Sequence, residues 1–249
     1  MKYALITGGT SGIGYELARK FAGNHYGIVI VSSSQERLKS TKEKLEKEFS
    51  ISVKTYEQDL SIIGAAVSLY EKIKADRIEV SVLVNNAGFG LAGAAEQIDL
   101  QRDESMMILN MITSVELMKL FLPDMYQRGS GKILNVASTG AFQPGPYTAS
   151  YHASKVFVLN YSRAVRFEAM KNGVQICVLC PGATKTDFFN KEGKPTPEYA
   201  MPADEVADYA YKRLMQNKEV SIPGMRNRLL KIAPISYRMK VIAKIKAPK

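Results

Sequence analysis

Short apolar segments alternate with longer amphipathic segments along most of the chain. The apolar segments are rich in β-branched residues, as buried strands are, and the longer segments repeat apolar residues at helical spacing. Strands are predicted at 3–7, 27–33, 51–57, 80–85, 131–137, 174–180 and 219–222, and helices at 13–23, 35–49, 63–75, 103–128, 150–171 and 203–216. Strands that alternate with helices form parallel sheets with right-handed crossovers. The pattern therefore predicts an α/β fold, a single doubly wound domain with a mostly parallel seven-stranded sheet.

Glycine, proline and serine mark the ends of these elements. Gly129, Gly131 and Gly173 lie where helices are expected to stop, and Ser34 is placed to cap the helix that follows it. The segment 187–202 is rich in prolines, glycine and aromatic residues and connects a strand to a helix. Because ligands bind beyond the carboxyl ends of strands in such sheets, this segment is predicted to be a substrate lid.

The first strand leads into a glycine-rich turn, Gly8-Gly9-Thr10-Ser11-Gly12-Ile13-Gly14, followed by an amphipathic helix. Glycines there permit a tight turn, let the backbone approach a pyrophosphate, and let helix and strand pack closely. The helix N-terminus offers free N–H groups to the anion. A glycine-rich loop without a ligand is the alternative, but the strand–turn–helix setting favours a dinucleotide and hence a Rossmann-type domain.

The end of the second strand bears on the choice of dinucleotide. NAD-binding domains carry an acidic residue there for the ribose 2′-hydroxyl, whereas this chain has Ser32, Ser33 and Ser34. A carboxylate would repel a 2′-phosphate, so its absence favours NADP, with NAD as the alternative. Arg37, one helical turn further on, adds positive charge near this position or is a solvated helix residue.

A tyrosine and a lysine four residues apart share one helix face. Tyr151/Lys155 and Tyr70/Lys74 both fit, so the spacing alone is weak. Tyr151 differs in its setting, because the strand before its helix delivers Ser138 at the end of the sheet where ligands bind. Reduction of a ketone needs a proton donor, and the pKa of a phenol, about 10, falls when an ammonium stabilises the phenolate. A serine hydroxyl would orient the carbonyl oxygen.

The cysteines and the termini exclude several classes of site. Cys177 and Cys180 lie in an apolar strand segment, where alternation sends them to opposite faces, so they are expected in the core and no metal site is predicted. No apolar run reaches the roughly 20 residues that span a bilayer, and no secretory signal fits the N-terminus. The expected location is cytoplasmic, with membrane association left open.

The net charge of +10 is concentrated at the C-terminus: residues 225–249 hold eight basic residues and no acid. We therefore divide the chain into a catalytic domain, 1–224, and a basic amphipathic tail, 225–249. Met239, Ile242 and Ile245 recur at helical spacing opposite Lys240 and Lys244, which suits an anionic lipid surface. A helix docked on the domain or on a sister subunit is equally consistent. Nucleic-acid binding is not expected, because no reader motif accompanies the charge.

Six motifs in register resemble the short-chain dehydrogenase/reductase family: TGGTSGIG (7–14), NNAG (85–88), Asn110, Ser138, YHASK (151–155) and PGATKT (181–186). Within it, the chain is most similar to DltE-like bacterial oxidoreductases. The resemblance implies a catalytic set of Asn110, Ser138, Tyr151 and Lys155. Tyr151 would be the acid/base, Lys155 would hold the nicotinamide ribose, and Asn110 would position a water that relays protons.

The resemblance also implies how the cofactor is bound. Asp59 would meet the adenine amino group, and residues 86–88 would lie beside the adenosine ribose. The implied cofactor-binding residues are Gly8, Thr10, Ser11, Gly12, Ile13, Gly14, Ser32, Ser33, Asp59, Leu60, Asn86, Ala87, Gly88, Tyr151, Lys155, Pro181, Gly182, Thr184 and Thr186. One departure weakens the choice of NADP: many NADP-preferring members carry a basic residue near position 11 or 33, where this chain has serine.

The expected activity is hydride transfer between NADP(H) and a carbonyl or secondary alcohol. Phe89, Phe142, Phe188, Phe189 and Tyr199 fall near strand ends or in the predicted lid and suggest an apolar, ketoacyl- or steroid-like substrate. The family resemblance suggests a homodimer or homotetramer through helices 103–128 and 150–171. A nucleotide-sensing protein with vestigial catalysis and a tail that binds a membrane or a partner is the alternative function.

Overall fold

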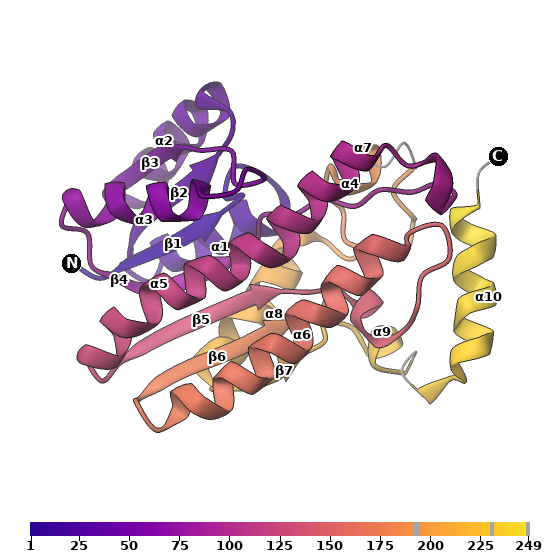
Figure 1. Ribbon diagram of the computed structural model, residues 1–249. Coiled ribbons are helices and arrows are strands. Elements are labelled where there is room, and N and C mark those ends of the chain that lie inside the picture. The colour runs from indigo at the N-terminus through magenta and orange to yellow at the C-terminus, as the bar shows by residue number, and fades with distance from the viewer. Residues whose placement is uncertain (192–194, 230–231, 248–249) are drawn as a thin grey trace.

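The computed structural model describes residues 1–191, 195–229 and 232–247 (Figure 1). Its single sheet has the order β3-β2-β1-β4-β5-β6-β7, and all neighbouring strands are parallel. The strands are β1 Tyr3–Thr7, β2 Gly27–Ser32, β3 Val53–Glu57, β4 Val80–Asn85, β5 Gly131–Val136, β6 Val174–Leu179 and β7 Val220–Ser221. The strand order reverses direction between β1 and β4. The predicted doubly wound α/β domain is therefore confirmed.

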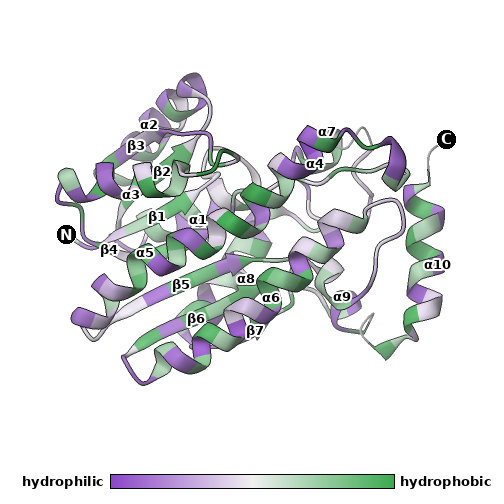
Figure 2. Cartoon of the chain, in the orientation of Figure 1, coloured by the Kyte–Doolittle hydropathy of each residue, from purple (hydrophilic) through white to green (hydrophobic). Residues whose placement is uncertain are grey.

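Helices cover both faces of the sheet, as Figure 1 shows. They are α1 Gly12–Ala22, α2 Gln35–Phe49, α3 Ala65–Ala75, α4 Leu100–Met107, α5 Thr113–Gln127, α6 Ala149–Met170, α7 Phe188–Lys191, α8 Ala203–Met215, α9 Met225–Leu229 and α10 Ile235–Lys246. Alternation in β1 divides the core: Ala4 and Ile6 pack with α1, α2 and α8, whereas Leu5 packs with α3, α5 and α6. Apolar residues follow the buried strands (Figure 2).

The predicted helix 103–128 is longer and less regular than expected. It begins at Leu100, and a π-helical segment, Ile108–Ile112, separates α4 from α5. The stretch Leu100–Gln127 is long and apolar enough to cross a membrane by length and composition. Leu117, Phe121 and Met125 are buried in the core, so one face of α5 packs within this domain.

Most residues predicted to begin or end a helix do so in the structure. Ser34 accepts a hydrogen bond from the N–H of Arg37 and caps α2. Gly129 and Gly173 adopt positive φ angles of 63° and 75° after α5 and α6. A Cβ on Gly173 would stand 2.1 Å from the Gly129 carbonyl oxygen, so glycine is required there. Gly131 was expected to stop a helix but is instead the first residue of β5.

The cysteines are buried as expected, and the segment predicted to be a lid connects β6 to α8. Cys177 and Cys180 are both buried and belong to different core clusters, as strand alternation requires. In the lid segment 187–202 the structure describes a short helix, α7, and residues 195–202, with 192–194 outside the described residues. Thr184 pairs with Met201 in an isolated parallel bridge, which fixes the two ends of this segment side by side.

Candidate active site

A cavity of about 810 Å³ lies at the carboxyl ends of the strands. Its walls come from the turn after β1, the ends of β2 to β6, the first turns of α6, and the C-terminal helices. In open α/β sheets this edge, at the point where the strand order reverses, is where ligands bind. The fold thus gathers residues from across the sequence around one cavity.

The turn after β1 forms one end of this cavity. Gly8 and Gly12 have positive φ angles of 63° and 54°, which glycine adopts without strain. A Cβ on Gly12 would stand 2.8 Å from Thr186 Cγ2, and one on Gly14 would stand 2.3 Å from the Gly8 carbonyl oxygen. Gly14 lies outside the cavity and lets helix α1 pack on the turn. The residues of the turn that line the cavity are Gly8, Thr10, Ser11, Gly12 and Ile13.

The ends of β2 and β3 supply polar side chains without a carboxylate at the second strand. Ser32, Ser33 and Arg37 line the cavity, and Ser32 Oγ lies 3.5 Å from Thr10 Oγ1. Asp59 and Leu60 line it from the end of β3. The Asp59 carboxylate accepts hydrogen bonds from the backbone N–H and the hydroxyl of Ser61, which orient it.

The segment after β4 is held by a residue that sequence reasoning missed. Asn86, Ala87 and Gly88 all line the cavity. The buried Thr7 hydroxyl accepts hydrogen bonds from the N–H groups of Asn86 and Ala87 and donates to the Val84 carbonyl. The Asn86 amide donates to the carbonyls of Thr7 and Gly8, so it ties the two loops together. Thr7 is the first residue of the TGGTSGIG motif, but the sequence analysis assigned it no role.

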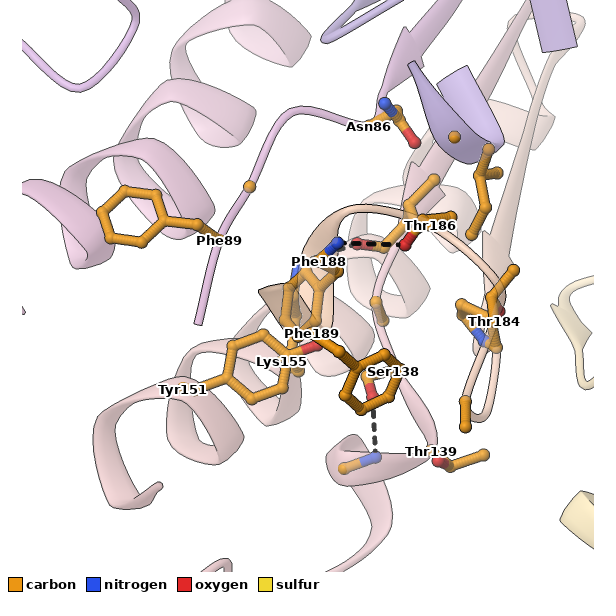
Figure 3. Close-up of a pocket in the computed structure, with 18 of the residues that line it drawn as sticks. Asn86, Phe89, Ser138, Thr139, Tyr151, Lys155, Thr184, Thr186, Phe188 and Phe189 are labelled. Atoms are coloured by element: carbon orange, nitrogen blue, oxygen red, sulfur yellow. Dashed lines mark hydrogen bonds between the residues drawn. The ribbon is translucent and has the colours of Figure 1, made fainter. Parts of the chain in front are cut away.

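Ser138, Tyr151 and Lys155 all line the cavity, and Figure 3 shows them in the same part of it. Ser138 follows β5 and caps the 3₁₀ turn Thr139–Phe142, with its Oγ accepting from the Gly140 N–H at 3.0 Å. That bond uses an acceptor position and leaves the hydroxyl proton free to donate. Tyr151 lies in the first turn of α6, and the Lys155 ammonium is 5.8 Å from the centre of its ring.

The Lys155 side chain is buried between α6 and β5. Its Nζ donates to the Val136 carbonyl oxygen at 3.0 Å, and its exposed fraction is 5%. Burial disfavours the charged amine and lowers its pKa from 10.5 to about 8. At neutral pH the ammonium is still the main form, so the site holds a positive charge beside the Tyr151 ring.

Asn110 lies in the π-helical segment and points toward the same centre. Its amide donates to the Phe89 carbonyl and to Ser154 Oγ, and its Oδ1 accepts from the Phe89 N–H. It is buried and does not line the cavity. A Cβ on Gly88 would stand 2.7 Å from Asn110 Oδ1 and 3.4 Å from Lys155 Nζ, so the three residues adjoin. π-helical turns are frequent at functional sites because they re-aim such a side chain.

The loop after β6 closes the cavity over Tyr151. Pro181, Gly182, Thr184 and Thr186 line it, and Thr186 Oγ1 accepts from the Phe188 N–H. The Phe188 ring lies 5.5 Å from the Tyr151 ring, centre to centre, and 6.0 Å from Phe189. Of the aromatic residues expected in the pocket, Phe89, Phe188, Phe189 and Tyr199 line it. Phe142 does not, because its side chain packs in the core beside α6.

Sequence reasoning did not anticipate that the tail forms a wall of this cavity. Residues of α9 and α10 line it, including Arg226, Asn227, Arg238, Val241, Ile242 and Ile245. Arg226 stacks on Tyr199, with the guanidinium 4.0 Å from the ring centre. Tyr70 and Lys74, the second pair with the same spacing, instead contact Asp124 on the surface, between α3 and α5.

A family model described as short chain dehydrogenase matches residues 2–196. The chain belongs to the short-chain dehydrogenase family. This short-chain dehydrogenase is 31% identical over 207 residues to a very-long-chain 3-oxoacyl-CoA reductase of Danio rerio, which covers 81% of the chain and 65% of that protein. The chain thus spans less than two thirds of the length of this curated relative.

Two solved structures extend the likeness to the whole chain. A short-chain dehydrogenase of Sphingobium yanoikuyae in complex with NADPH superposes with a TM-score of 0.86 at 26% identity, covering 100% of this chain and 98% of that one. An alcohol dehydrogenase of Comamonas testosteroni specific for bulky-bulky ketones has a TM-score of 0.83 at 26% identity, covering 98% and 95%. Both likenesses include the C-terminal segment of this short-chain dehydrogenase that lies beyond the residues matched by the family model.

Proposed function

We propose that this protein is an NADP(H)-dependent reductase of an apolar ketone or aldehyde. The observation that carries the proposal is the meeting of Ser138, Tyr151 and Lys155 in one cavity with the glycine turn after β1. A hydroxyl, a phenol and a buried ammonium supply what carbonyl reduction requires of a protein: an orienting donor, a proton donor and a positive charge beside it.

The residues present fit a dinucleotide with a 2′-phosphate. Gly12 lines the cavity with no side chain, and a Cβ there would stand 2.8 Å from Thr186 Cγ2, so glycine leaves room for a pyrophosphate. Helix α1 begins at Gly12, and a helix N-terminus offers N–H groups to an anion. Ser32, Ser33 and Arg37 form a neutral to positive rim at the end of β2. The Sphingobium yanoikuyae relative was solved with NADPH, which supports the same cofactor here.

The proposed mechanism assigns each group one task. NADPH, when bound, supplies the hydride. Tyr151 donates its phenolic proton to the carbonyl oxygen, and the Lys155 ammonium stabilises the phenolate that remains. Ser138 donates a hydrogen bond to the same oxygen and holds it in place. Asn110, locked by the Phe89 backbone, positions a proton path to Lys155 and does not touch the substrate.

The substrate proposed from the cavity walls is apolar. Phe188 packs on Tyr151, Phe189 packs on Phe188, and Val241, Ile242 and Ile245 line the wall made by α10. Ketoacyl and steroid-like ketones both fit this description. The names of the Danio rerio and Comamonas testosteroni relatives, a very-long-chain 3-oxoacyl-CoA reductase and a bulky ketone-specific dehydrogenase, support a large apolar ketone.

Oxidation of NADPH in the presence of carbonyl compounds tests the function. We expect loss of NADPH absorbance with apolar ketones or aldehydes, and the corresponding alcohol as product. Binding of NADPH without turnover of any carbonyl or alcohol in the panel would favour the alternative, a nucleotide-sensing protein. The absence of NADPH binding would reject both.

A carboxylate at position 33 should reverse the preference for the cofactor. Ser33→Asp places a negative charge at the rim where the 2′-phosphate is expected, and like charges about 4 Å apart repel by roughly 1–4 kcal/mol. We expect the Kd of NADPH to rise about tenfold or more while the Kd of NADH stays equal or falls, as measured by fluorescence titration. The neutral variant Ser33→Asn is the control, and equal losses in the two variants would contradict the reason given.

Several finer expectations stay predictions. Phe157, Phe167 and Met170 on α6 are exposed, which suits the expected self-association through α5 and α6. Four other expectations rest on the sequence alone: the division into a domain 1–224 and a tail 225–249, cytoplasmic location, lipid contact through the tail, and the narrower likeness to DltE-like oxidoreductases. The docking of α10 at the cavity favours the docked-helix interpretation of the tail over the interfacial one.

A further inference from the structure

Helix α10 turns three apolar residues toward the cavity, Val241, Ile242 and Ile245, with the basic residues Arg238 and Lys246 lining it at the two ends of the helix. Arg238, Val241, Ile242 and Ile245 line the cavity, and their spacing of three, four and seven residues defines one side of a helix. Lys240 and Lys244 are exposed and do not line it. Met239, expected from the sequence to share the apolar face, lies outside the lining, and Val241 takes its place.

One bond explains this rotation of the helix. Arg238 is 9% exposed, and its Nη1 donates to the Phe142 carbonyl oxygen at 3.0 Å. Phe142 ends the 3₁₀ turn that Ser138 caps. At the other end of α10, the Lys246 ammonium lies 5.6 Å from the centre of the Phe189 ring. The helix thus contacts the turn that presents Ser138 and, through Lys246, the Phe189 ring, which packs on Phe188.

The apolar side chains between these two contacts are only partly covered by protein. Val241 is 39% exposed and Ile245 is 54% exposed, although both line the cavity. From Arg238 to Ile245 the face runs roughly 10 Å, at about 1.5 Å per residue. Covering such a strip of apolar surface is favourable, and the strip is continuous with the space around Tyr151.

We propose that the inner face of α10, Val241, Ile242 and Ile245, is the binding site for a straight apolar chain on the substrate. This rests on the proposed function and narrows it, because a long-chain ketone is then preferred over a small or a rigid polycyclic one. The face shares its cavity with Tyr151, so its occupant enters with the reacting carbonyl. A lipid surface or another protein would meet the outer face, where Lys240 and Lys244 lie.

Kinetics with a series of straight-chain methyl ketones of increasing length test the assignment. In the parent enzyme kcat/KM rises by roughly fourfold for each methylene that the face buries. In the double variant Val241→Asn, Ile245→Asn the rise in kcat/KM falls below about twofold per methylene. The matched control Lys240→Asn, Lys244→Asn changes adjacent positions at the same spacing on the outer face, and it keeps the parent's rise in kcat/KM per methylene.

We call Val241→Asn, Ile245→Asn the inner-pair variant and Lys240→Asn, Lys244→Asn the outer-pair variant. A further variant and a second measurement test the proposal if the inner-pair substitutions disturb folding. Val241→Phe narrows the apolar strip on α10, so kcat/KM stops rising at a shorter ketone chain than in the parent. With NADP bound, a long-chain methyl ketone raises the Tm of the parent and of the outer-pair variant but raises that of the inner-pair variant less. This shift does not depend on turnover.

These experiments distinguish a failure of the role of α10 from a failure of the proposed function. Three results would each overturn the role of α10. The first is an equal rise in kcat/KM per methylene in the inner-pair variant and the parent, and the second is a loss of that rise in the outer-pair variant. The third is a steroid ketone that is reduced better than every long-chain ketone. If no carbonyl is reduced by the parent while NADPH binds, the proposed function fails, and the Tm shift still reports on the chain-binding face.

Discussion

Tyr151→Phe lowers kcat for carbonyl reduction by a hundredfold to ten-thousandfold and leaves the Kd of NADPH within about twofold. The substitution removes one hydroxyl and keeps the ring that contacts Phe188 and faces Lys155. The loss arises because the developing alkoxide then takes its proton from water, without a positioned donor. Steady-state rates with an apolar ketone, together with NADPH fluorescence titration, measure both quantities.

The control for this variant lies on the same helix. Tyr161→Phe also removes a phenolic hydroxyl from α6, but Tyr161 stacks on Phe157 away from the cavity. Its kcat should stay within twofold of the parent. A Tyr151→Phe enzyme that retains more than about a tenth of the parent rate would show that another group donates the proton.

Lys155→Met abolishes most of the activity and at the same time stabilises the free protein at pH 7. Burial lowers the pKa of Lys155 from 10.5 to about 8, so holding the ammonium inside the fold costs up to about 3 kcal/mol at neutral pH. Methionine fills similar space without a charge. The lost hydrogen bond to the Val136 carbonyl offsets about 1 kcal/mol, which leaves a gain of roughly 1–3 kcal/mol.

The pH dependence of this gain follows from proton binding. Between pH 8 and 10.5 the unfolded chain binds a proton at Lys155 that the folded chain has released, so the stability of the parent rises with pH. The advantage of Lys155→Met is therefore complete below pH 8 and vanishes as the pH approaches 10.5. Urea unfolding of both proteins without nucleotide, at several pH values, measures it.

A surface lysine supplies the comparison for Lys155. Lys74→Met removes the exposed ion pair with Asp124, and we expect a loss of less than about 1 kcal/mol with no effect on turnover. A Lys155→Met protein that is less stable than the parent to the same extent at pH 7 and at pH 10 would mean that packing, not the buried charge, determines the difference.

Patterns within short stretches of the sequence predicted much of the fold and part of the cavity. The glycine turn was predictable because its conformation depends on neighbours within a few residues: positive φ at Gly8 and Gly12, and close packing at Gly14. Strand and helix positions followed from periodicity for the same reason. The π-helical segment at Ile108–Ile112 did not, because the buried residues Met106, Asn110, Thr113 and Leu117 continue at spacings of three and four residues through it.

The sequence by itself determined the doubly wound sheet, the dinucleotide turn and the set of side chains available for chemistry, since each depends on local propensity or on a motif. Only the tertiary structure decided how they meet: that Thr7 holds the segment after β4, that Asn110 adjoins Lys155 across Gly88, and that α10 forms a wall of the cavity. These contacts join residues dozens of positions apart. The Arg238 bond to the Phe142 carbonyl sets the rotation of α10, and a pattern within the tail contains no information about a carbonyl 96 residues away.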